Sequence, residues 1–141
     1  MEHDKKIILV SHGKLAEGML HSIQMIVGEH KELSCMGMMP GEHYQSMVDA
    51  IEQSVKEHPE TQHLIVADLL GGSVCNGMSI LTTYPNVKLI AGMNMGLVIE
   101  LLLNPQVLSD EEIDRVIQMA KDMNKRVVLE KDANEGEEAF F

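Results

Sequence analysis

Short runs of consecutive apolar residues alternate along this chain with longer segments in which apolar residues recur every three or four positions. Four runs have the length and composition of strands buried on both faces of a parallel sheet, and they lie at residues 7–10, 33–38, 64–67 and 87–91. The periodic segments predict helices at residues 14–28, 44–55, 74–81, 95–103 and 110–123. A last short strand is expected at residues 127–129.

This alternation predicts an α/β fold, because parallel strands need crossover connections and helices provide them. We expect an open, mainly parallel, twisted sheet flanked by helices on both faces, with the flavodoxin-like strand order 2-1-3-4. A chain of 141 residues fits one hydrophobic core. We therefore expect one domain over residues 1–130, followed by a polar, acidic tail at 131–141 that ends in Phe140 and Phe141.

Composition and charge restrict the classes of partner. The chain is 45% hydrophobic and 23% charged, which is a globular balance. The 11 Lys and Arg residues stand against 22 Asp and Glu residues, and the resulting net charge of −11 disfavours nucleic acid and anionic lipid surfaces. No apolar stretch approaches the roughly 20 residues of a membrane-spanning helix, and the charged start does not resemble a secretory signal. We expect a cytoplasmic protein without direct membrane insertion, in which Cys35 and Cys75 are free thiols.

Two complementary side chains follow the first and third predicted strands. In open sheets of this kind, ligands bind beyond the carboxyl ends of the strands, at the point where the strand order reverses. In the order 2-1-3-4 the first and third strands are neighbours there, and their ends carry His12 and Asp68. A carboxylate that accepts a hydrogen bond from one ring nitrogen leaves the other nitrogen unprotonated and nucleophilic. We therefore predict that His12 is a catalytic nucleophile and that Asp68 orients it.

Small residues surround this pair. Gly13, Gly71 and Gly72 remove side chains from its neighbourhood, and Ser73 begins the third predicted helix, where a hydroxyl and first-turn amides suit an anion. These four residues are the candidates for phosphate binding. Phosphoryl transfer depends mainly on positioned groups and on donors that stabilise charge, so we expect neither a metal nor a cofactor here.

The remaining histidines and Cys75 receive no catalytic role. The histidines at positions 3, 21, 30, 43, 58 and 63 fit no metal-binding spacing, and residues 58–63 are predicted to form a surface loop. Cys75 is interpreted as a small buried thiol. The glycine pattern of dinucleotide-binding turns and the Walker lysine signature are both absent from the sequence. A flavin- or nucleotide-binding module that uses the same crevice nevertheless stays open as an alternative.

Four spaced motifs resemble the enzyme IIA component of the mannose/fructose/sorbose-family phosphoenolpyruvate-dependent sugar phosphotransferase system. The resemblance spans most of residues 7–123. It rests on Ser11-His12-Gly13 followed by Ala16-Glu17-Gly18, on Pro40-Gly41-Glu42, on the motif from Asp68 to Ser73 with Asn76, and on the motif from Ala91 to Asn94.

The resemblance implies that residues 1–130 are a single IIA-type phosphocarrier domain. His12 would accept phosphate from the histidine phosphocarrier protein and donate it to a IIB component, upstream of the membrane components IIC and IID, and Asp68 would be its acidic partner. It also implies a homodimer, in which the short strand at 127–129 packs onto the other subunit. A phosphocarrier subunit that feeds dihydroxyacetone kinase is an alternative within the same class.

The chain departs from the family pattern at three positions near the predicted site. The family usually has an aromatic residue where Leu70 stands, and a Pro-Phe pair where Val74 and Cys75 stand. We expect all three side chains to line the mouth of the site. There they would bear on which IIB component docks and hence on which sugar is served.

Overall fold

The structure, a computed structural model, describes residues 5–130, so the predicted tail at 131–141, with Phe140 and Phe141, lies outside the described residues. Along the chain the elements are β1 (Lys5–His12), α1 (Leu15–Val27), β2 (Leu33–Met38), α2 (Gln45–Glu57), β3 (Gln62–Ala67), α3 (Ser73–Met78), the 3-10 helix η1 (Ser79–Thr83), β4 (Val87–Ala91), α4 (Met95–Leu103) and α5 (Asp110–Asp122). The alternation of strands and helices is as predicted.

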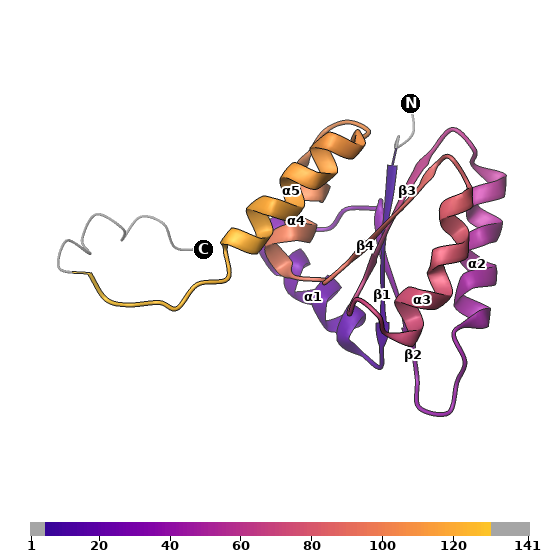
Figure 1. The fold of residues 1–141 in the computed structure, drawn as a ribbon, viewed down its shortest axis with the longest axis horizontal. Helices are drawn as coiled ribbons and strands as arrows, with labels where there is room; N and C mark the ends of the chain where they lie inside the picture. Colours follow the sequence, from indigo (N-terminus) through magenta and orange to yellow (C-terminus); the bar gives the residue numbers. More distant parts are fainter. Residues whose placement is uncertain (1–4, 131–141) are drawn as a thin grey trace.

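The four strands form one sheet in the order β2-β1-β3-β4, and every neighbouring pair is parallel. This order confirms the prediction 2-1-3-4. Figure 1 views the sheet nearly edge-on, with α1, α4 and α5 on one face and α2 and α3 on the other. The four connections that leave the carboxyl ends of the strands therefore gather at one edge of the sheet.

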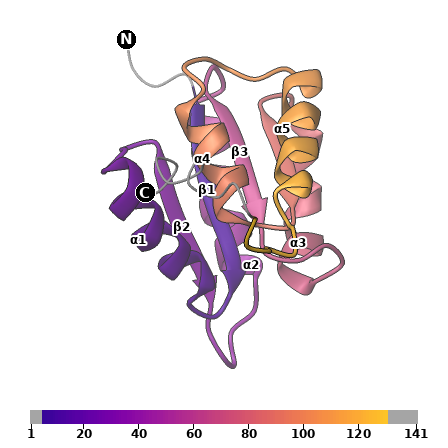
Figure 2. The same ribbon diagram turned by 90° about the vertical axis from the view of Figure 1, so that its left-hand side faces the viewer.

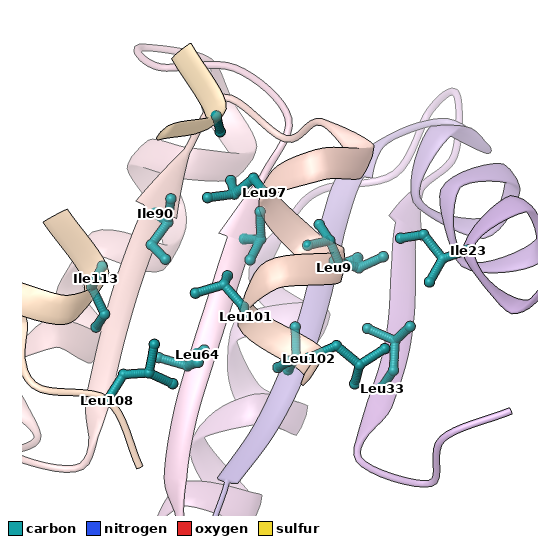
Figure 3. Packing of buried hydrophobic residues seen from close by; sticks show 14 of the residues in the cluster. Leu9, Ile23, Leu33, Leu64, Ile90, Leu97, Leu101, Leu102, Leu108 and Ile113 are labelled. Carbon is teal, nitrogen blue, oxygen red and sulfur yellow. The ribbon is translucent and has the colours of Figure 1, made fainter. Parts of the chain in front are cut away.

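Residues of β1 alternate between the two faces of the sheet, and each face has its own core. Ile7 and Leu9 belong to the cluster under α1, α4 and α5, which Figures 2 and 3 show from the helix side. Ile8 and Val10 belong to the cluster under α2, α3 and η1. Each fully buried Leu or Ile contributes about 1.5–3 kcal/mol relative to its exposed state. Burial on both faces explains why this strand reads as an uninterrupted apolar run.

Three boundaries differ from the sequence prediction. The first strand is longer than residues 7–10, because its polar ends at Lys5 and His12 pair with the neighbouring strands. The third helix, predicted at 74–81, is divided into α3 and the tighter η1. The strand expected at 127–129 is wrong for the single chain: these residues are exposed and belong to no strand within the described structure. Exchange of this segment in a dimer stays a prediction.

Within residues 5–130, no helix is long and apolar enough to cross a membrane.

The surface loop predicted at residues 58–63 is wrong at its end, because His63 lies fully buried in β3. Its Nδ1 donates to the carbonyl of Thr61 at 2.9 Å, so its Nε2 is the acceptor for the Ser54 hydroxyl, also at 2.9 Å. Burial lowers the pKa of His63, and the charges of Lys6 and His58 lower it further, against the opposing bond to Thr61. A polar residue is therefore accommodated inside the sheet as a neutral imidazole.

We predict that this buried imidazole makes the fold sensitive to mild acid. Because the pKa of His63 is lower in the folded chain, the unfolded chain binds more protons, and stability falls as the pH drops from about 7 to about 5. In His63→Gln the free energy of unfolding should be lower by about 2 kcal/mol at neutral pH but depend less on pH over this window. Denaturant melts at several pH values measure both effects. His21→Gln, at an exposed position on α1 that takes no part in the His63 shift, should keep the wild-type slope.

Candidate active site

A tight turn joins the end of β1 to the start of α1 and presents His12 at the carboxyl edge of the sheet. Gly13 adopts a φ of +58°, a left-handed conformation that favours glycine. Its backbone N–H donates to the carbonyl of Met38 at 2.8 Å, which fixes the turn to the end of β2. The His12 side chain is 45% exposed. The turn therefore holds an accessible imidazole on a rigid base.

Asp68 meets His12 across the junction of β1 and β3. One carboxylate oxygen, Oδ2, lies 2.8 Å from the backbone nitrogen of His12 and 2.8 Å from its ring Nδ1. An ionised carboxylate can only accept, so Nδ1 carries the proton and a neutral ring keeps Nε2 free of one. The structure brings the two predicted residues together, and the backbone bond is an addition that the side-chain pattern did not indicate.

The second carboxylate oxygen of Asp68, Oδ1, is buried and has no hydrogen-bond partner within residues 5–130. Burial opposes ionisation of this carboxyl, but bonds from the backbone and ring of His12, together with the backbone of Leu69, hold the pKa of Asp68 below its ordinary value. The ionised form thus stabilises the folded chain at neutral pH. This contribution is lost as the pH falls through the lowered pKa.

Ser73 lies on the other side of the imidazole. Its Oγ is 3.2 Å from Nε2 of His12, and with Nε2 unprotonated the hydroxyl is the donor. A Cβ on Gly72 would lie 3.3 Å from Cε1 of His12, so glycine leaves room for the ring. Asn76 makes the first bond of α3, from its N–H to the Gly72 carbonyl, and the first-turn N–H groups at 73–75 therefore have no acceptor within the helix.

Gly71 and Gly72 contribute to the site through hydrogen bonds of their backbone. The N–H of Gly72 donates to the Leu69 carbonyl at 3.1 Å, and the carbonyl of Gly71 accepts from the Asn76 side chain at 3.2 Å. These bonds close the connection between β3 and α3 around the imidazole. The residues predicted from the sequence for this site all lie at the same edge of the sheet: His12, Gly13, Asp68, Gly71, Gly72 and Ser73.

The three departures from the family pattern do not share one environment. Leu70 is 81% exposed beside the site, as expected. The expectation that Val74 and Cys75 line the mouth of the site was wrong, because both are buried in the core beneath α3; the interpretation of Cys75 as a small buried thiol is confirmed. Burial raises the pKa of the Cys75 thiol and the Asp68 charge raises it further, against an opposing backbone bond from Gly71. Cys75 is thus a neutral buried thiol, and Leu70 alone of these three is exposed.

Sequence reasoning missed the part played by Ser11. Its side chain is fully buried, and its Oγ accepts a hydrogen bond of 2.8 Å from the N–H of Ala16 in the first turn of α1. The signal was present in the strand pattern, because Ser11 follows Ile7 and Leu9 on the face that α1 covers.

Among residues 5–130, no group of three His, Cys, Asp or Glu side chains could hold a metal ion.

Comparison with known proteins gives this site a family context. A family model described as the fructose IIA component of the phosphotransferase system matches residues 6–128. The sorbose-specific EIIA component of Klebsiella pneumoniae is 31% identical over 112 residues, which are 79% of this chain and 82% of that protein. The mannose-specific EIIAB component of Escherichia coli is 25% identical over 124 residues, and the match covers 86% of this chain but only 38% of that longer protein.

A solved structure agrees with these sequence matches. The mannose/sorbose-specific IIA subunit of the phosphotransferase system from Enterococcus faecalis superposes with a TM-score of 0.79 and 32% identity, over 93% of this chain and 98% of that one. The family model and the sorbose-specific relative both cover most of the chain. The chain therefore belongs to the mannose family of enzyme IIA components of the sugar phosphotransferase system.

Proposed function

We propose that the chain is a phosphohistidine carrier: Nε2 of His12 accepts a phosphoryl group from the histidine phosphocarrier protein and donates it to a IIB component for sugar uptake. The observation that carries this proposal is the double contact of Asp68 Oδ2 with the backbone and the ring Nδ1 of His12. It leaves Nε2 as the unprotonated nitrogen of an accessible ring. Family membership supports the same donor and acceptor.

The chemistry balances without a metal or a base. The lone pair of Nε2 forms a bond to phosphorus as the bond between phosphorus and the donor's histidine nitrogen breaks, and that electron pair returns to the donor's ring. The proton on Nδ1 stays in place, so the phosphorylated ring of His12 is cationic. Asp68 offsets this charge. The Ser73 hydroxyl, which bonds Nε2 in the free chain, then donates to a phosphoryl oxygen, and Gly13 and Gly72 leave room for the group.

The edge of the sheet that bears His12 is poor in charge although the chain is strongly acidic. The connections that leave the carboxyl ends of the strands are residues 13–14, 39–44, 68–72 and 92–94. The Lys, Arg, Asp and Glu residues in these connections are Lys14, Glu42 and Asp68. These four connections therefore carry a formal net charge of only −1. A partner that carries a phosphoryl dianion can approach this edge with little repulsion.

Two exposed leucines beside His12 support a protein as the partner. Leu69 is 61% exposed and Leu70 is 81% exposed, in the connection that also carries Asp68. Large apolar side chains that stay exposed next to a reactive group are typical of protein contact surfaces. The exposed apolar segment at residues 127–129 likewise supports the homodimer that family resemblance implies. The structure thus offers one apolar surface near the chemistry and one far from it along the chain.

Phosphorylation of His12 is the first expectation. Incubation with phosphoenolpyruvate, enzyme I and the histidine phosphocarrier protein should give an acid-labile, base-stable phosphate adduct on the wild type and none on His12→Gln. His21→Gln, which alters an exposed histidine on α1, should label like the wild type. Equal labelling of His12→Gln would overturn the proposal, and a flavin or nucleotide bound to the purified protein would favour the alternative module.

Asp68→Asn removes the negative charge of this side chain and keeps its shape, so it tests the electrostatic role of Asp68. The Asn oxygen can still accept the backbone and ring bonds of His12, and its amide group would occupy the buried place of Oδ1, so the fold should persist. Without the negative charge the cationic phosphorylated ring is less stable, and the initial rate of labelling should fall about 100-fold or more. Asp49→Asn, on the exposed surface of α2, is the matched control. Wild-type rates in Asp68→Asn would refute the electrostatic role.

Leu70→Gln tests the docking surface. Loss of this apolar contact should lower the rate of transfer from limiting phosphorylated donor protein about fivefold to tenfold, as expected for about 1 kcal/mol of interface energy. Labelling by phosphoramidate, a small donor that needs no protein contact, should be unchanged. Leu103→Gln, at an equally apolar exposed position at the far end of α4, should leave both rates unchanged. An equal loss with both donors would argue against docking at Leu70.

A further inference from the structure

We infer that Ser11 is a positioning residue for the reactive imidazole: its buried hydroxyl closes the turn that carries His12 onto the first turn of α1, and so fixes the tautomer and direction of the ring. This inference rests on the proposed function for its kinetic consequence. Its structural content, the state of the His12 ring, is independent of phosphate.

The Ser11 hydroxyl is satisfied on both sides within the turn. It accepts the N–H of Ala16 at 2.8 Å and donates to the carbonyl of Gly13 at 3.4 Å. Both Ser11 and Ala16 are fully buried. Water therefore cannot replace the hydroxyl as the partner of this N–H, and its loss would leave a buried donor unsatisfied.

The bond stands in for a helix cap that the local sequence lacks. Lys14 occupies the cap position of α1, and within the described chain its side chain makes no capping hydrogen bond. Capping side chains ordinarily come from the cap residue itself and accept the N–H of the second or third helical residue. Here Ala16 is that second residue, and the acceptor is Ser11, five residues earlier. The bond therefore closes a ring of backbone that contains His12.

The alternation of side chains in β1 gives adjacent residues separate tasks. Ser11 continues the face of Ile7 and Leu9 toward α1, whereas His12 continues the face of Ile8 and Val10 toward α3. Rotation of the Ser11 peptide would therefore turn the imidazole away from Asp68. The Asp68 bonds hold His12 from the β3 side, and the Ser11 bond holds the same peptide from the α1 side. Both are needed for one ring orientation.

The test compares Ser11→Ala, Ser11→Thr and a matched control, Ser54→Ala. Ser54 also donates a hydroxyl to a partly buried hydrogen bond, to Nε2 of His63 near the amino ends of the strands, away from His12. Two quantities are measured: the initial rate of phosphoryl transfer from the phosphorylated histidine phosphocarrier protein, and the tautomer of His12 from nitrogen–proton correlations of its ring in the unphosphorylated protein. The second readout does not require any transfer, and a merely structural defect would not move it.

Ser11→Ala should lower the transfer rate by about 10-fold to 100-fold and reduce the share of ring protonated on Nδ1. Ser11→Thr, which keeps the hydroxyl, should restore both, and Ser54→Ala should change neither. Wild-type rate and tautomer in Ser11→Ala would overturn the inference and leave the proposed function intact. Equal defects in Ser11→Ala and Ser54→Ala would also overturn it, because they indicate general loosening. Absence of labelling in the wild type would instead overturn the proposed function, and the tautomer would still decide the role of Ser11.

Discussion

The pair of bonds from His12 to one oxygen of Asp68 is the constraint around which the rest of the structure is arranged. It requires that β1 and β3 be neighbours, that both end at the same edge, and that the N–H of His12, two residues beyond the last pairing of β1 with β3 at Val10, face Asp68. A parallel sheet with the order 2-1-3-4 meets all three conditions. The two cores on its faces keep that geometry rigid, so the proposed transfer would need little reorganisation of the site.

The carboxylate serves two purposes through this geometry. Bonding to a backbone N–H fixes where Asp68 lies, and bonding to Nδ1 with the same oxygen transfers that fixed position to the ring. A bond to the ring alone would let the two side chains move together. Because these bonds lower the pKa of Asp68, its carboxyl group is ionised near neutral pH. The site therefore needs few residues, and most of them are small.

Much of this arrangement was predictable from the sequence. The apolar runs located the strands because strands buried on both faces leave a continuous signal, and the neighbouring ends of two such runs brought His12 to Asp68. The burial of His63 was not predictable, since its partners Thr61 and Ser54 compensate for a polar residue only once α2 has packed on the sheet. The sequence allowed both a core position and a position at the mouth of the site for Val74 and Cys75, because a helix of six residues shows too little periodicity to decide between them.

The division of labour between adjacent residues of β1 also limits how this strand can change in length. Ser11 faces one helical layer and His12 the other, as Leu9 and Val10 do before them. Insertion or deletion of a single residue would exchange the two layers, so that the hydroxyl would face α3 and the imidazole would be buried under α1. Only changes of two residues preserve the assignment. The chemistry proposed for the end of the strand thus depends on whether the number of residues before it in the strand is odd or even.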